Sequence, residues 1–337
     1  MRTRLLLCTR VLLLGFVIPL ILSTIVYQFF STNLTSGELF SKQGFEGQYE
    51  NGVYKYRVLG RILLLKTYDL ITLYQIPASA PKSILDGHGD PQFYAAYFFM
   101  NTIFLCLTSV VLFFIFDGHH RKDFTTVELP LLFLCILMAI TQFVVVPYDT
   151  LSYFFVALAA QLIIHDNRTS RRTIALGAIV ILATLTRESS SLILAFYFAI
   201  NYRDLLARPA NFRLNQKQRA LLTIAFCFLC TYVGLRFIFG YEHAVYQRFR
   251  LLANMTSQLS VSGAIFFASL AFLLLSTKPS SKEISVFFIA ALPYILPIFL
   301  AANTGEIRLW TPVIILAVIL KVQASRSQMI TQQEPVM

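Results

Sequence analysis

Arg187 and Glu188 stand side by side in the middle of a long apolar segment. Between Thr173 and Asn201 they are the only two residues that carry a charge. An ionisable side chain at membrane depth is costly, and it is kept mainly where it binds a substrate, an ion or a partner charge. The pair therefore belongs to a functional site or forms a structural ion pair.

More carboxylates and arginines lie near the ends of other apolar segments. They are Glu46, Glu50, Arg57, Arg61, Asp149, Glu306 and Arg308. Each type of residue also has an ordinary role that involves no chemistry. A carboxylate in a polar loop is solvated, arginines on an amphipathic helix lie along lipid, and aspartate is a preferred helix N-cap.

Together these residue types suit the transfer of a sugar from a lipid-linked phosphate. A carboxylate must take the proton of the acceptor hydroxyl, and cations must hold the phosphate leaving group. Glu46 or Asp149 suits the first role. Arginine suits the second, because its planar guanidinium donates two parallel hydrogen bonds to phosphate. The arginines in question are Arg57, Arg61, Arg187 and Arg308.

The composition places these residues in a membrane protein. Of the 337 residues, 57% are hydrophobic and 13% are charged, whereas a soluble domain has about 25% charged residues. The net charge of +11 fits basic loops on the cytoplasmic side and contact with anionic lipid, rather than binding to nucleic acid. The sequence therefore predicts a lipid bilayer as a partner and no nucleic acid.

Hydropathy predicts an all-α fold, a polytopic transmembrane helical bundle of about ten spans. The predicted spans are 7–29, 92–116, 129–147, 149–165, 173–186, 189–202, 220–240, 259–276, 285–301 and 309–322. Basic residues gather in alternate loops, which places the N- and C-termini on the cytoplasmic side. The turn at 186–189 then lies at or near the external face, where most of the candidate carboxylates also gather.

A single transmembrane catalytic domain is predicted over residues 1–325. Residues 30–91 form its external loop, in which apolar residues recur near helical spacing from 56 to 74. This pattern predicts an amphipathic helix that lies on the membrane surface. Residues 326–337 are polar and are expected to form a disordered cytoplasmic tail.

The order of these features resembles the GT-C superfamily of integral membrane glycosyltransferases, which use polyprenyl-phosphate sugars. Its members carry an acidic motif in the first external loop, and Glu46, with Glu50 as a second candidate, occupies that position. The helix expected at 56–74 is similar to the juxtamembrane helix of the family. Asp149 resembles its second acidic residue, and GEIRLWTP, with Arg308, is similar to its late Arg-then-Pro segment.

The resemblance implies a hexosyl- or pentosyltransferase that acts on the external face of the membrane. The compact form without large domains suggests a bacterial inner membrane, whose external face is periplasmic. The donor would be a polyprenyl-phosphate sugar, and the acceptor a glycan, a lipid or a protein. Glu46 would be the general base, and Asp149 would orient the acceptor or a divalent cation. Arg187 and Arg308 would bind the lipid phosphate, with Glu188 orienting Arg187. No metal-ligand set is predicted, and a divalent cation is the one cofactor left open.

One departure and two alternatives accompany this interpretation. The acids of the family are often adjacent, whereas Gly-Gln-Tyr separates Glu46 from Glu50, so which acid is the base stays open. A lipid-linked polysaccharide polymerase or ligase would also use external arginines, but its large loop normally comes late in the chain. A transporter or flippase would fit the short arms around Arg187, although the sequence has no internal repeat.

Overall fold

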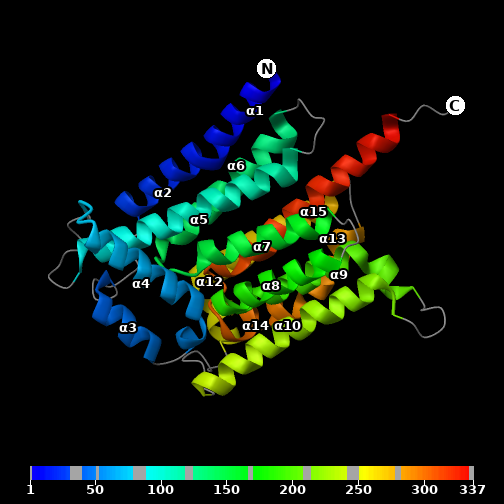
Figure 1. The fold of residues 1–337 in the computed structure, drawn as a ribbon. Coiled ribbons are helices and arrows are strands. Elements are labelled where there is room, and N and C mark those ends of the chain that lie inside the picture. The colour runs from blue at the N-terminus through cyan, green and yellow to red at the C-terminus, as the bar shows by residue number, and fades with distance from the viewer. Residues whose placement is uncertain are drawn as a thin grey trace. The chain divides into compact units, whose positions relative to one another are not determined.

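The computed structural model of the protein describes residues 2–30, 40–50, 53–78, 89–117, 124–165, 170–207, 214–240, 250–277 and 282–333. Within these ranges the regular structure is helical throughout and contains no strand (Figure 1). The all-α prediction is therefore confirmed for the part of the chain that is described.

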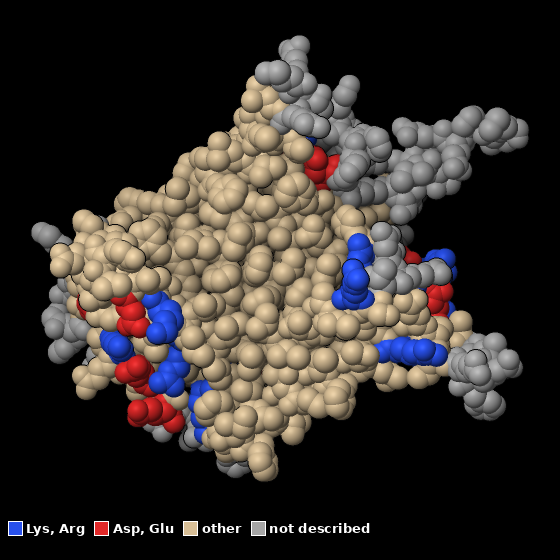
Figure 2. Space-filling model, in the orientation of Figure 1, with Lys and Arg blue, Asp and Glu red and all other residues tan. Residues whose placement is uncertain are grey.

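Five of the described helical segments are long and apolar enough to cross a membrane. They are Leu5–Phe29, Pro91–Asp117, Gln216–Phe239, Gln258–Ser276 and Ile307–Ser325. A sixth span is possible if Lys282–Ala290 and Leu292–Ala301, which meet at a bend of 51°, cross as one broken helix. Figure 2 shows a wide area of the surface without charged side chains, as lipid contact requires. The protein is a multi-pass membrane protein.

The predicted number of about ten spans is not confirmed. Four predicted spans correspond to helices of 16 or 17 residues. These helices are α6 (Phe124–Ile140), α7 (Asp149–Ile164), α8 (Ser170–Thr186) and α9 (Ser191–Leu206). A 16-residue helix is about 24 Å long, which is shorter than the roughly 30 Å hydrocarbon core. Side chains buried inside a protein are as apolar as those that face lipid, so hydropathy alone does not decide whether these helices cross the membrane.

The chain divides into two compact units. The first consists of residues 1–155, 182–188 and 231–245. Its elements are α1 (Arg2–Leu12), a π-helical turn (Leu13–Val17), α2 (Ile18–Phe29), α3 (Lys42–Glu50), a 3-10 turn (Val53–Tyr56), α4 (Val58–Leu73), α5 (Pro91–Asp117), α6 and a 3-10 turn (Thr141–Phe143). The start of α7 and the end of α8 complete it, together with the end of α10 (Gln216–Phe239).

The second unit consists of residues 156–181, 189–230 and 246–337. Besides the rest of α7, α8 and α10, it holds a 3-10 turn (Glu188–Ser190, shared with the first unit), α9, α11 (Leu251–Thr256), α12 (Gln258–Ser276), α13 (Lys282–Ala290), α14 (Leu292–Ala301) and α15 (Ile307–Gln333). Helix α15 continues to Gln333, where a disordered tail was expected from 326, because the glutamines and methionine of this segment favour helix. The single catalytic domain over 1–325 stays a prediction.

Helix α4 lies within the segment 56–74, where a helix was expected, and its place on the membrane surface stays a prediction. It packs against the segment before α7 through Gly60, where a Cβ atom would lie 3.1 Å from the Pro147 carbonyl oxygen and 3.2 Å from Tyr148 Cβ. Real Cβ contacts are seldom this short, so glycine permits an approach that a larger residue would resist. This contact brings α4, with Arg57 and Arg61 at its start, to the first residue of α7.

Candidate functional site

The centre of the candidate site is a buried ion pair between Asp149 and Arg187. Asp149 is the first residue of α7, and Arg187 directly follows α8. The Arg187 Nη1 donates a hydrogen bond to Asp149 Oδ1, and the two side chains are 4% and 0% exposed, respectively. Charges this deep are tolerated only when paired, so the loss of either residue would leave an uncompensated buried charge.

Tyr148 lies beside this pair and stacks with a second arginine. The guanidinium carbon of Arg57 lies 4.1 Å from the centre of the Tyr148 ring, and that of Arg187 lies 5.9 Å from it. Arg57 also lies 5.2 Å from the Tyr54 ring. Its Nη2 is 3.7 Å from Glu188 Oε2. The tyrosine faces thus hold the cation in place by cation–π attraction.

One helical turn further along α4, Arg61 lies over a third tyrosine. Its guanidinium carbon is 5.6 Å from the centre of the Tyr49 ring. Tyr49 is 2% exposed, and its buried hydroxyl has no hydrogen-bond partner among the described residues. Burial raises the pKa of Tyr49 well above its usual value, so the hydroxyl stays protonated at any ordinary pH.

The tyrosines connect these contacts into one cluster. Tyr54 lies between the other two, with ring centres 6.3 Å from Tyr49 and 6.2 Å from Tyr148. We call this set the arginine–tyrosine cluster, and it consists of Tyr49, Tyr54, Arg57, Arg61, Tyr148, Asp149, Arg187 and Glu188. All of its members belong to the first unit. Its arginines outnumber its carboxylates, so it carries a surplus of positive charge suited to an anion.

A buried hydrogen-bond network fixes the segment that presents Tyr148. The Asn101 Nδ2 donates to the carbonyl oxygen of Val146 at 3.1 Å and to the Tyr27 hydroxyl at 2.7 Å. The Thr150 hydroxyl donates to Asn101 Oδ1 at 2.7 Å. Because these groups are buried on three elements, the network holds the start of α7 in one position.

A further arginine of the first unit, Arg236 near the end of α10, contacts the 3-10 turn that precedes α4. The Tyr56 hydroxyl donates to the carbonyl oxygen of Gly240 at 2.7 Å. The guanidinium carbon of Arg236 lies 4.7 Å from the Tyr56 ring centre and 3.4 Å from that of Tyr232. Sequence reasoning left Arg236 aside because it lies within an apolar span. Its two tyrosine contacts show how a charge near a span end is accommodated.

The two acids predicted as base lie on α3 rather than in a loop. Glu46 is half-buried and Glu50 is exposed, and they stand one helical turn apart. Neither forms an ion pair with a residue that the structure describes. Tyr49 follows Glu46 by three residues on the same helix, so α3 carries both a member of the cluster and the candidate base.

The late candidates pair with each other. Arg308 places Nη2 at 2.8 Å and Nε at 2.9 Å from Glu306 Oε2. Both residues belong to the second unit, and their part in a phosphate site stays a prediction. Glu188, expected to orient Arg187, instead forms its ion pair with Arg57.

The tyrosines are the part of the site that sequence reasoning missed. A signal was present, because Tyr148 directly precedes Asp149 and Tyr49 directly precedes Glu50. Aromatic residues are common at membrane interfaces, however, so this signal is weak.

No three histidine, cysteine or carboxylate side chains come together as a metal site in the described ranges. Comparison of the chain with protein-family models, with curated proteins and with solved structures finds no match. The chemistry of the arginine–tyrosine cluster is therefore the basis on which a function is proposed.

Proposed function

We propose that the protein is a membrane glycosyltransferase of the GT-C type. It transfers a sugar from a polyprenyl-phosphate donor to a glycan, lipid or protein acceptor. The reaction takes place on the external face of a bacterial inner membrane, with both termini of the chain in the cytoplasm. The observation that carries this proposal is the arginine–tyrosine cluster, in which arginines from α4 and tyrosine rings converge beside a buried ion pair.

The arginines of α4 are best suited to the phosphate. Asp149 offsets the charge of Arg187, so this pair has a structural role and leaves the phosphate to other arginines. Arg57 is held on its face by Tyr148, and its contact with the partly exposed Glu188 is loose at 3.7 Å. A phosphate could displace Glu188 and accept two parallel hydrogen bonds from Arg57. As the sugar leaves, these donors would stabilise the charge that develops on the phosphate.

The acceptor would be activated from α3. Glu46 takes the proton of the acceptor hydroxyl, and the acceptor oxygen then forms a bond to the anomeric carbon while the phosphate leaves. Tyr49, on the same helix, stays protonated and holds Arg61 over its ring. Asp149 serves to orient Arg187 and Tyr148 in this arrangement, rather than as the base.

The test uses the full chain reconstituted in liposomes. The donors are polyprenyl-phosphate hexoses and pentoses with labelled sugars, and release of free polyprenyl phosphate is measured together with transfer of the label. Arg57→Gln should lower transfer by about 100-fold, since loss of one donor to a developing oxyanion has that effect. Lys66→Gln on the same helix, whose side chain is 74% exposed, is the matched control. Full activity of a folded Arg57→Gln variant would contradict the proposal.

A transporter or flippase is the second candidate, and one observation favours it. Helices α13 and α14 meet at a bend of 51°, with Pro297 inside α14. Broken helices of this kind hold the substrate in many transporters. The same liposomes distinguish the two functions, because a flippase moves the intact donor between leaflets, whereas a transferase cleaves its sugar–phosphate bond.

A further inference from the structure

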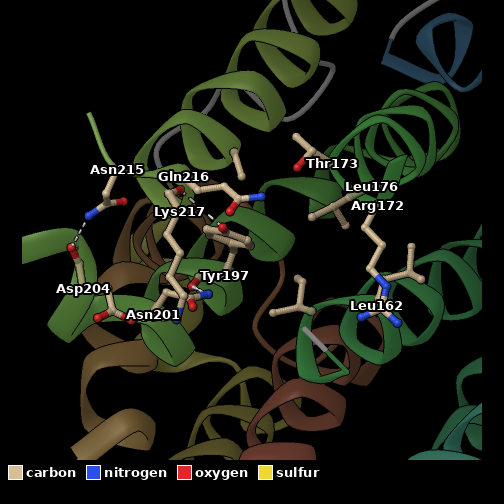
Figure 3. Close-up of a pocket in the computed structure, with 12 residues that line it drawn as sticks. Leu162, Arg172, Thr173, Leu176, Tyr197, Asn201, Asp204, Asn215, Gln216 and Lys217 are labelled. Carbon is tan, nitrogen blue, oxygen red and sulfur yellow. Dashed lines mark hydrogen bonds and ion pairs between the residues drawn. The ribbon is translucent and has the colours of Figure 1, made fainter. Parts of the chain in front are cut away.

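The second unit contains a pocket of about 210 Å³ that shares no residue with the arginine–tyrosine cluster (Figure 3). The C-terminal part of α7, the start of α8, the C-terminal part of α9 and the start of α10 surround it. Leu162 and Leu176 supply apolar lining, while Asn201, Arg172 and Lys217 supply polar groups. The pocket is thus amphipathic and carries cations on two different helices.

Arg172 is the pocket residue whose polar groups are not all satisfied within the protein. Its Nη1 is buried and has no hydrogen-bond partner among the residues that the structure describes. Figure 3 shows Arg172 and Lys217 on opposite walls of the pocket. A buried donor without an acceptor costs free energy, and the cost is larger for a charged group. The guanidinium lines the pocket, and an anion there would supply an acceptor once Nη1 turns toward it.

Lys217 provides the second cation, and its position is fixed. Its Nζ lies 2.6 Å from Asp204 Oδ2. At the start of α10, the Asn215 N–H donates to Gln218 Oε1 at 2.9 Å, and the Gln218 N–H donates to Asn215 Oδ1 at 2.8 Å. This reciprocal cap, together with a hydrogen bond from Asn215 Nδ2 to the Asp204 carbonyl oxygen, holds Lys217 at the pocket. Asp204 is 58% exposed and can turn away to water.

We propose that this pocket binds a phosphate group. Two cations from different helices line the pocket, and charge-assisted hydrogen bonds to phosphate are among the strongest available to a side chain. The apolar wall suits the glycerol and first acyl carbons of an anionic phospholipid, and basic pockets between membrane helices bind such headgroups. Inorganic phosphate offers the same chemistry without the apolar part. The site serves lipid or phosphate binding and does not depend on the proposed sugar transfer.

Binding to the full chain in phosphatidylcholine nanodiscs tests the proposal. The probes are phosphatidylglycerol, added phosphatidylcholine and inorganic phosphate, and bound molecules are counted by native mass spectrometry. Wild-type protein should retain phosphatidylglycerol, or inorganic phosphate if the free ion is the ligand, in preference to added phosphatidylcholine. Arg172→Gln should weaken this binding by about fivefold, the effect of one basic residue near a phosphate.

Arg171→Gln is the matched control, since Arg171 is exposed on the same turn of α8 and does not line the pocket. It should leave binding within about twofold of wild type. Asp204→Asn should tighten binding, because it removes the carboxylate that competes for Lys217. Arg172→Lys, which keeps the charge, should restore part of the loss and serves as the test if Arg172→Gln does not fold.

The outcomes separate the alternatives. Equal losses in Arg171→Gln and Arg172→Gln would mean unspecific attraction to the surface and would overturn the proposal. So would the absence of any preference for phosphatidylglycerol or phosphate, or weaker binding by Asp204→Asn. Thermal unfolding of each variant in phosphatidylcholine shows whether a loss of binding comes from misfolding.

Discussion

Asp149 and Arg187, 38 residues apart in the chain, form a buried ion pair that joins the start of α7 to the end of α8. Both helices are short for a membrane span, and both contribute residues to each of the two units. The pair therefore ties together two of the three sequence segments that make up the first unit. Tyr148 and Glu188 are the neighbours of the pair in the sequence, and both contact Arg57.

Removing one partner of this pair should destabilise the protein strongly. Asp149→Asn leaves Arg187 charged and buried without its carboxylate, and a loss of about 3–5 kcal/mol in the free energy of unfolding is expected. The double variant Asp149→Asn/Arg187→Gln should lose less than the sum of the single variants, since no uncompensated charge remains. Unfolding in detergent micelles measures both.

A surface ion pair supplies the control for this experiment. Arg203 is 74% exposed and lies 3.8 Å from Glu283, so Arg203→Gln should cost at most about 1 kcal/mol. If Asp149→Asn cost no more than Arg203→Gln, the pair would not be the frame of the site.

Adding a side chain at Gly60, which contacts the segment before α7, should lower the free energy of unfolding. Gly60→Ala places a Cβ at 3.1 Å from the Pro147 carbonyl oxygen, so α4 must shift, at an expected cost of about 1–3 kcal/mol. Gly47→Ala on α3 is the matched control, because nothing lies within 4 Å of its added Cβ. That change should stabilise the helix by about 0.5–1 kcal/mol. Opposite signs in thermal unfolding are expected, and equal effects would contradict the close approach.

The sequence predicted those features that are determined by residues close together in the chain. Helix α4 was expected at 56–74 and spans Val58–Leu73, because its apolar periodicity is a property of the segment itself. The break between α8 and α9 was likewise marked by Arg187 and Glu188, whose charges interrupt an apolar run.

Relationships between distant segments were not predictable in the same way. Glu188 was expected to orient Arg187 because it is adjacent, but the ion pair that the structure shows for Glu188 is with Arg57. Asp149, which pairs with Arg187, comes from another helix and was assigned a separate role. The same limit applies to the number of spans, since hydropathy does not distinguish α7, whose Leu151 and Val156 are fully buried, from a lipid-facing helix.

The face of Tyr148, rather than its hydroxyl, should hold Arg57. Tyr148→Phe keeps the ring and should leave the KM for the polyprenyl-phosphate donor within about twofold of wild type, whereas Tyr148→Leu removes the stacking and should raise it by about fivefold or more. Donor titration in liposomes gives the two values. Equal KM values for the two variants would show that the ring does not position the arginine.

Alkaline pH should destabilise the folded protein through Tyr49. Burial raises the pKa of Tyr49 in the folded state, whereas in the unfolded chain it titrates near its ordinary value. The folded state therefore retains a proton that the unfolded state loses, and stability falls as pH rises past the unfolded pKa. Tyr49→Phe should unfold with a weaker dependence on alkaline pH than wild type. An unchanged dependence would mean that Tyr49 contributes nothing to it.

Glu46, rather than Glu50, should supply the base. Both acids lie on α3, but Glu46 is half-buried, three residues before Tyr49, whereas Glu50 is exposed. A general base contributes about 100- to 10,000-fold to rate, so Glu46→Gln should lower kcat on that scale with little change in KM for the donor. Glu50→Gln should lower kcat by less than about tenfold, as expected for a charge that is near the site without moving a proton. The reverse order of effects would assign the base to Glu50, and normal kcat in both variants would remove α3 from the mechanism.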